Sequence, residues 1–204
     1  MEGDAPPRPG DDLRDAAPHL PRTDDENMFE GHGAAAYPSL MDIRPASPDD
    51  ALAIETIRVR GWRSAYRHVF PAAELDGLPI DPERWRARLA VPPQGWTTIV
   101  CEDDGNVVGF ASTGPSRDED DFGELYAIYV DPDAWSTGAG RALMAAAEAA
   151  LVAEYGAALL WVLDDNPRAR RFYERSGWAP DGVRKAEECF GVRAAEVRYR
   201  KDFA

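Results

Sequence analysis

The chain has 204 residues, two cysteines and a net charge of −14, with 37 acidic against 23 basic residues. An acidic protein of this kind repels nucleic acid, so we exclude a nucleic-acid partner. No apolar run of about 18 residues is present, and no apolar stretch marks the N-terminus, so neither a membrane span nor a signal peptide is predicted. We therefore expect a cytoplasmic protein without membrane or nucleic-acid partners, monomeric or homodimeric.

The composition changes near residue 40. Residues 1–40 are rich in proline and glycine, carry nine acidic against three basic residues and lack a periodic apolar pattern. A segment of this composition cannot bury enough apolar surface to offset its ordering entropy. We expect a disordered acidic tail over 1–40 and one folded domain over 41–204.

The predicted elements of the domain alternate between strands and helices. A short strand over 41–46 is followed by a helix that Ser47 caps and that continues to about Tyr66, a short helix within 70–78, and a helix that begins at 81–83. Strands over 97–101 and 107–113 flank a hairpin turn, and a further strand starts near Gly123. Strict alternation would place Glu124, Tyr126, Ile128 and Val130 on one face of that strand, and Leu125, Ala127 and Tyr129 on the other.

A glycine turn follows this strand and leads into an alanine-rich helix. Gly138 and Gly140 would allow an anion to approach the unpartnered N–H groups at the helix start. A nucleotide P-loop is excluded because the chain has no Gly-Lys pair. A dinucleotide-binding turn is disfavoured because Leu143 stands where its third glycine belongs. A coenzyme A turn and a glycine-capped turn without ligand remain.

A second segment distinguishes these two. After an apolar strand over 158–163, the chain reads N-x-x-A-x-x-F-Y-E-x-x-G-W from Asn166 to Trp178. Strand, glycine turn, helix, strand and this motif, in this order, resemble the GNAT superfamily of acyl-CoA-dependent N-acetyltransferases over about residues 41–203. The resemblance implies an α/β fold in which four or more helices flank a mixed sheet of about six or seven strands. One departure is Trp135, which stands where the family often has Gln or Arg.

The same resemblance implies acetyl-CoA as co-substrate and assigns its contacts. Backbone groups of the strand before the turn would hold the pantetheine arm, the turn would bind the pyrophosphate, and the second motif would add further contacts. Arg168, Arg170 and Arg171 could reach phosphates, or form a solvated helix face. The expected cofactor residues are Tyr129, Val130, Ser136, Thr137, Gly138, Ala139, Gly140, Arg141, Ala142, Asn166, Ala169 and Tyr173.

Acetyl transfer to an amine requires a proton donor for the departing thiolate and a base for the amine. Tyr173 is the candidate acid, with packing beside Phe172 as the alternative. Glu124 is the candidate base and a possible acceptor contact, unless it is a charge at a strand edge in water. Trp62 and Tyr66, four residues apart on one helix face, either border the acceptor or belong to the core, and Glu196 on the last strand is a candidate for binding the acceptor ammonium.

No metal is expected, because Cys101 and Cys189 lie apart without metal-site spacing and read as structural thiols. The acidic run 118–121 reads most simply as a solvated loop, with a collar for a polyamine as the alternative. We expect an N-acetyltransferase for a small amine such as a polyamine, an amino acid derivative or an amine-bearing antibiotic. A protein lysine or N-terminal amine is the alternative acceptor, and a non-catalytic acyl-CoA-binding module is the alternative class.

Overall fold

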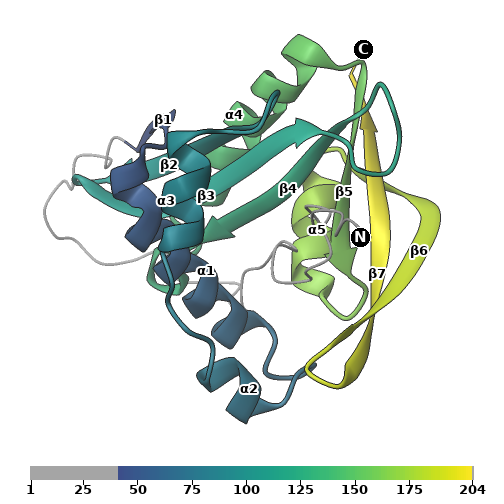
Figure 1. Cartoon of the computed structure of the whole chain (residues 1–204). Coiled ribbons are helices and arrows are strands. Elements are labelled where there is room, and N and C mark those ends of the chain that lie inside the picture. The colour runs from purple at the N-terminus through teal and green to yellow at the C-terminus, as the bar shows by residue number, and fades with distance from the viewer. Residues whose placement is uncertain (1–40, 204) are drawn as a thin grey trace, which may run out of the picture.

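The computed structural model describes residues 41–203, so the predicted disorder of 1–40 lies outside the described residues. A seven-stranded sheet has the order β1-β2-β3-β4-β5-β7-β6 (Figure 1). Its parallel and antiparallel neighbours, with helices on both faces, confirm the predicted α/β fold. The strands are β1 (Asp42–Pro45), β2 (Thr97–Asp103), β3 (Asn106–Pro115), β4 (Gly123–Val130), β5 (Ala157–Leu163), β6 (Ala179–Cys189) and β7 (Val192–Asp202).

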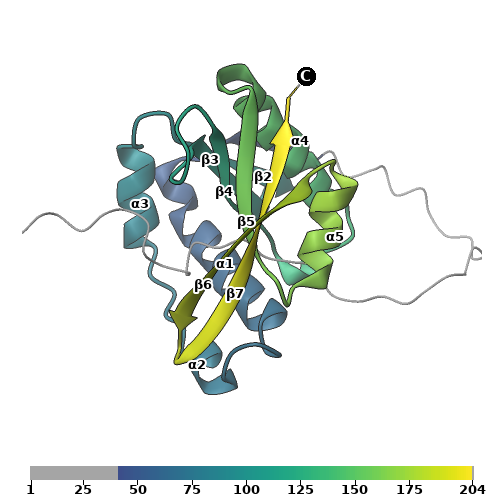
Figure 2. The same cartoon turned by 90° about the vertical axis from the view of Figure 1, so that its right-hand side faces the viewer.

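The helices form two layers, one on each face of the sheet. Figure 2 shows α1 and α3 on one side and α4 and α5 on the other. Each layer has its own apolar core, because the two faces of a sheet carry separate sets of side chains. The helices are α1 (Ala51–Ala65), α2 (Ala72–Asp76), α3 (Glu83–Ala90), α4 (Ala139–Glu154) and α5 (Pro167–Arg175), with short 3₁₀ turns at Pro48–Asp50 and Pro132–Ala134.

Strand β4 departs from the strict alternation that the sequence predicts. Thr113 of β3 faces Leu125, whereas Ser112 faces Ala127, so Tyr126 is an extra residue in β4. Such a bulge shifts the side chains on one side of it to the opposite face. Leu125 therefore packs in the same core as Ile128 and Val130 and not with Ala127 and Tyr129, and the predicted face assignment was wrong for this residue.

The sheet opens between β4 and β5. These two strands are the parallel pair, and their register consists of two pairs, Gly123 with Ala158 and Glu124 with Leu159. In Figure 1 they lie together at one end and separate toward the other. The glycine turn follows the separated end of β4, and α5 follows that of β5. This gap therefore lies beside the segments from which the sequence predicts binding and catalysis.

Candidate active site

The turn between β4 and α4 has the geometry of an anion-binding helix start. Gly138 is the N-cap of α4 with a φ of 106°, in the left-handed region that a residue with a side chain rarely adopts. A Cβ at this position would meet no atom within 4 Å, so the turn faces open space. Helix geometry leaves the first-turn N–H groups without intrahelical partners, and the helix dipole makes this end positive.

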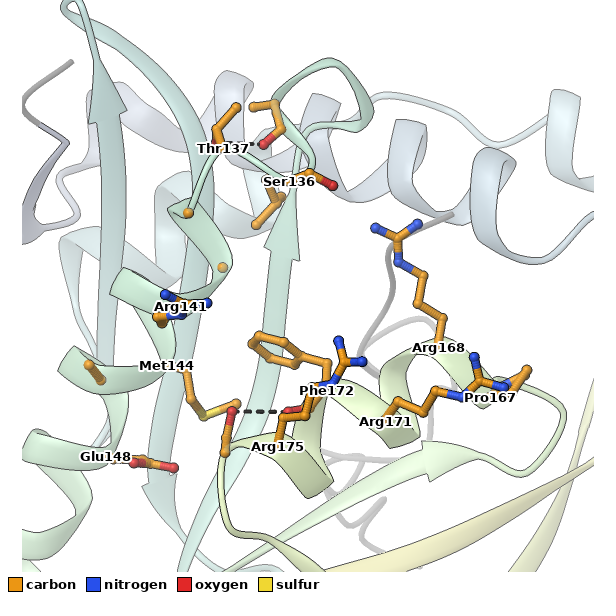
Figure 3. A pocket seen from close by; sticks show the side chains of 16 residues that line it. Ser136, Thr137, Arg141, Met144, Glu148, Pro167, Arg168, Arg171, Phe172 and Arg175 are labelled. Atoms are coloured by element: carbon orange, nitrogen blue, oxygen red, sulfur yellow. Dashed lines mark hydrogen bonds between the residues drawn. The ribbon is translucent and has the colours of Figure 1, made fainter. Parts of the chain in front are cut away.

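A cleft of about 1170 Å³ runs from this turn between α4 and α5 (Figure 3). It is lined from three segments: the end of β4 with the glycine turn, the first turns of α4, and one side of α5 with Ser176. Six of the predicted cofactor residues line it. Among the lining residues are Val130, Ser136, Thr137, Gly138, Gly140, Arg141, Met144, Glu148, Arg168, Arg171, Phe172 and Arg175.

The other predicted cofactor residues have different surroundings. The Ala139 and Ala169 side chains are buried in the core beside α4 and α5, and Ala142 does not line the cleft. Arg175, by contrast, was not predicted, although it follows Arg171 by four residues and so lies on the same helix face. That spacing could have identified it.

The cleft is strongly basic for so acidic a protein. Four arginines line it, at 141, 168, 171 and 175, against one acid, Glu148.

The Arg168 guanidinium lies 5.0 Å from the centre of the Trp135 ring, a cation–π contact. Its buried Nη1 has no partner within residues 41–203, and burial lowers its pKa to about 10. The Trp135 indole in turn donates to the Val130 carbonyl at 2.9 Å. Trp135, which stands where the family often has Gln or Arg, thus positions the Arg168 guanidinium beside the glycine turn.

Asn166 begins the second motif and has two distinct amide ends. Its Oδ1 accepts from the Ala169 N–H at 3.1 Å, so it caps α5. Its Nδ2 is buried and has no partner in the described part of the chain. Because a buried amide donor without a partner costs free energy, this nitrogen is suited to donate a hydrogen bond to an acceptor atom of a ligand.

Tyr173 lies on α5 and is fully buried. Its hydroxyl has no hydrogen-bond partner among the described residues. Burial, together with the nearby Tyr129 hydroxyl, raises its pKa above the ordinary value, so it is protonated at neutral pH. Tyr129 belongs to β4 on the opposite face of the sheet, where its hydroxyl accepts from the Trp62 indole at 2.8 Å. Tyr173 packs in the core on the α4–α5 side, so the two tyrosines belong to the cores on different faces of the sheet.

Trp62 and Tyr66 of the first helix lie in the core, as the core alternative predicted. They are 1 % and 0 % exposed, and their rings form an edge-to-face contact with 4.8 Å between centroids. Through Tyr129, however, Trp62 also supports the site. A direct contact of either residue with the acceptor stays a prediction.

Glu124 is buried, at 1 % exposure, and is paired with Arg117. The Arg117 backbone N–H donates to Oε2 at 3.0 Å, and its guanidinium Nε lies 3.2 Å from each carboxylate oxygen. Both carboxylate oxygens are therefore in contact with Arg117. The alternative that Glu124 is a solvated charge at a strand edge is wrong, because the side chain is buried. Its role as the base stays a prediction.

Glu196 of β7 is also buried, and it retains an unused oxygen. Its Oε2 lies 3.3 Å from the Lys185 ammonium, while Oε1 has no partner within residues 41–203. Burial raises the pKa of this carboxyl, and Lys185 opposes the shift. Glu196, the residue predicted to bind the acceptor ammonium, is thus a buried carboxylate with one oxygen that can still accept a hydrogen bond.

Within residues 41–203, no group of three or more His, Cys, Asp or Glu side chains is arranged to hold a metal ion. Cys101 is buried and Cys189 is half-buried, and neither forms a disulfide within the described residues. No helix in this part of the chain is both long and apolar enough to span a membrane.

Known proteins of one family match this chain in sequence and in fold. The family model described as "Acetyltransferase (GNAT) family" matches residues 59–178. The uncharacterized N-acetyltransferase YuaI of Bacillus subtilis is 35% identical over 167 residues, which cover 78% of this chain and 91% of that protein.

Solved structures share the fold at low sequence identity. The PaiA N-acetyltransferase of Thermoplasma acidophilum, in complex with coenzyme A, has a TM-score of 0.63 and 16% identity, covering 80% of this chain and 99% of that one. The ribosomal-protein-alanine N-acetyltransferase of Brucella melitensis has a TM-score of 0.65 and 23% identity, covering 79% and 99%. On the family match and the YuaI relationship, the chain belongs to the GNAT family of acetyltransferases, and its enzyme class is acyltransferase.

Proposed function

We propose that this protein transfers the acetyl group of acetyl-CoA directly to the primary amine of a small molecule, with Tyr173 as the general acid. The observation that carries the proposal is the Tyr173 hydroxyl, which is buried without a partner where the sheet opens, and whose neighbour Phe172 lines the arginine-rich cleft. A module that only binds acyl-CoA has no need of a proton donor at this position.

The residues present fit acetyl-CoA. The open turn at Gly138 and the arginines of the cleft suit its phosphates, and the unpartnered Nδ2 of Asn166 suits a carbonyl of its pantetheine arm. When bound, acetyl-CoA supplies an activated acyl group with a thiolate leaving group. In the proposed reaction Tyr173 donates its proton to the sulfur as the amine displaces it, and its raised pKa keeps that proton in place until then.

One assay tests the proposal. The protein is incubated with acetyl-CoA and a panel of polyamines, amino acid derivatives, aminoglycosides and a peptide with a free N-terminus, while free thiol is measured and products are identified by mass. Thiol release with a small amine supports the proposal. Release with the peptide alone would establish the alternative acceptor, and tight acetyl-CoA binding without release for any amine would establish a binding module.

A first prediction concerns the glycine turn. A Cβ at Gly140 would lie 3.7 Å from Phe172 and Val130, which is ordinary contact, so Gly140→Ala should bind acetyl-CoA like the wild type. The branched side chain of Gly140→Val would extend into the cleft. We expect its dissociation constant to rise at least about tenfold, or roughly 1.4 kcal/mol. An unchanged constant in a folded Val variant, measured by calorimetry, would exclude the turn as the phosphate site.

A second prediction concerns Arg168. Arg168→Met keeps an apolar stem over Trp135 but removes the charge, so coenzyme A binding should weaken about tenfold because a charge-assisted hydrogen bond is lost. Inhibition by pantetheine, which has no phosphate, should not change. Arg86→Met, on the exposed side of α3, is the control for the altered net charge. Equal losses for coenzyme A and pantetheine would contradict a phosphate contact.

A further inference from the structure

The β6–β7 hairpin places a second set of functional groups beside the open sheet. Glu196 faces Leu163 of β5 and Lys185 of β6 in the strand register. Its neighbour two residues earlier, Ala194, packs in the core on the α1 side together with Trp62 and Leu163. Glu196 therefore lies on the face opposite to the cleft between α4 and α5, which is the face an amine would approach if acetyl-CoA fills that cleft.

An ammonium group already occupies this position. The Lys185 Nζ lies 3.3 Å from Glu196 Oε2, 3.0 Å from Glu187 Oε1 and 4.5 Å from the centre of the Trp161 ring. A carboxylate together with an aromatic face is the chemistry that binds organic ammonium ions. The Lys185 side chain is 35% exposed, so it can move into solvent and leave the site to another ammonium.

On the Glu196 face of the sheet, the basic side chains are paired with acidic ones. Arg198 is bound by both Glu119 and Asp181. The indole of Trp161 donates to Asp118 from the same acidic loop, at 2.6 Å. The loop predicted as solvated thus reaches the sheet with its first two acids. An acidic rim attracts a molecule with several positive charges, whereas the arginines of the opposite cleft attract phosphates.

We propose that the acceptor is an aliphatic polycationic amine, and that its reacting ammonium displaces Lys185 from Glu196 and the Trp161 ring. Glu196 then serves, in place of Glu124, as the group that takes the proton of this ammonium. The inference rests on the proposed function and names its substrate class.

The proton balance of the reaction follows. Glu196 accepts one proton from the ammonium, and the freed lone pair of nitrogen forms the C–N bond to the acetyl carbon as the C–S bond breaks. The sulfur receives the Tyr173 proton, and the second proton lost from nitrogen restores Tyr173. Glu196 finally releases its proton to solvent, so an ammonium and a thioester become an amide, a thiol and one proton.

The groups around Glu196 define the pH dependence. Burial and Glu187 raise its pKa, whereas Lys185 and Arg117 lower it, and the net direction is upward. Burial raises the pKa of the Tyr66 hydroxyl of α1 well above its ordinary value, and Tyr129, Glu196 and Tyr173 add to that shift. Because only the ionised carboxylate binds ammonium, kcat/KM should fall as pH falls through this raised pKa.

Three variants and spermidine as the probe test the proposal. With coenzyme A present, calorimetry should show that Glu196→Gln weakens spermidine binding at least about tenfold, the equivalent of one lost charge contact. Glu188→Gln removes an exposed acid of the same strand outside the ammonium position, so it should bind as the wild type does and is the matched control. Lys185→Met should bind spermidine more tightly, because the competing ammonium is gone. Acetyl-CoA binding should be equal in all four proteins.

The pH profile separates a role in proton transfer from a structural one. Lys185→Met should shift the acidic limb of kcat/KM to higher pH, since a cation that lowers the Glu196 pKa is absent, and Glu196→Gln should abolish that limb. Spermidine binding equal in Glu196→Gln and wild type would overturn the proposal. Acetylation of small monoamines that carry no further positive charge, without acetylation of spermidine, would also overturn it, and this outcome preserves the proposed acetyltransferase function. Binding of spermidine that depends on Glu196, but without thiol release, would support the ammonium site and contradict the proposed function.

Discussion

Tyr173→Phe should lower kcat by roughly 10²-fold while leaving the KM for acetyl-CoA nearly unchanged, as expected for loss of a general acid. The substitution keeps the ring, which packs 5.6 Å from Phe172 and 6.2 Å from Tyr199 between centroids. The hydroxyl that it removes has no partner within residues 41–203, so stability should hardly change or should increase. Steady-state kinetics and thermal unfolding measure the two effects.

The control is Tyr199→Phe, which removes another buried hydroxyl. That hydroxyl accepts from Arg170 at 3.1 Å and donates to Glu174 at 2.8 Å, so its loss should reduce stability and leave kcat unchanged. A Tyr173→Phe enzyme with wild-type turnover, when chemistry is the slow step, would leave water as the proton source.

The role of Tyr173 as general acid also predicts how kcat depends on pH. Activity requires the protonated phenol, and burial raises its pKa, so the alkaline limb due to Tyr173 should lie above the ordinary tyrosine value of about 10. Below that pH the wild-type kcat should show no decline from this group. A limb centred between pH 8 and 9 that disappears in Tyr173→Phe would contradict the buried, uncharged state of the phenol.

Arg117→Met should destabilise the fold by about 3 kcal/mol, because it leaves the Glu124 carboxylate buried without its cation. Glu124 is 1% exposed, whereas the Arg117 side chain is 30% exposed, so the low end of the range for broken buried pairs applies. For a domain of this size the loss corresponds to a Tm lower by roughly 6–12 °C. Differential scanning calorimetry measures it.

The double variant Arg117→Met/Glu124→Gln supplies the control, because removing both charges should restore much of the lost stability. Glu124→Gln alone also tests the alternative base. If the folded variant loses turnover with unchanged acetyl-CoA binding, Glu124 has the catalytic role and Glu196 does not. If it loses stability but keeps kcat, its role is to hold Arg117 and the loop 116–122.

Local chemistry made much of the site predictable. Gly138 was predictable as a turn residue, because glycine adopts a φ such as the observed 106° without strain. The order of strand, turn, helix, strand and helix follows from apolar periodicity. These features depend on neighbours within a few residues and are therefore written in the sequence.

The bulge at Tyr126 shows where this reasoning ends. Whether a strand alternates strictly depends on its pairing partner, here β3, and the sequence of β4 alone does not specify that pairing. The separation of β4 from β5 is likewise a property of two strands that lie more than 25 residues apart in the chain.

By itself, therefore, the sequence determined the family, and it predicted a turn for phosphate and a candidate acid, since short motifs with fixed spacing carry them. Only the tertiary structure decided which cation lies against each buried carboxylate. Arg117 occupies both oxygens of Glu124, whereas Lys185 leaves one oxygen of Glu196 unused. The environment of a buried acid depends on which cation the fold brings against it, and that contact, together with the water it excludes, exists only in the folded chain.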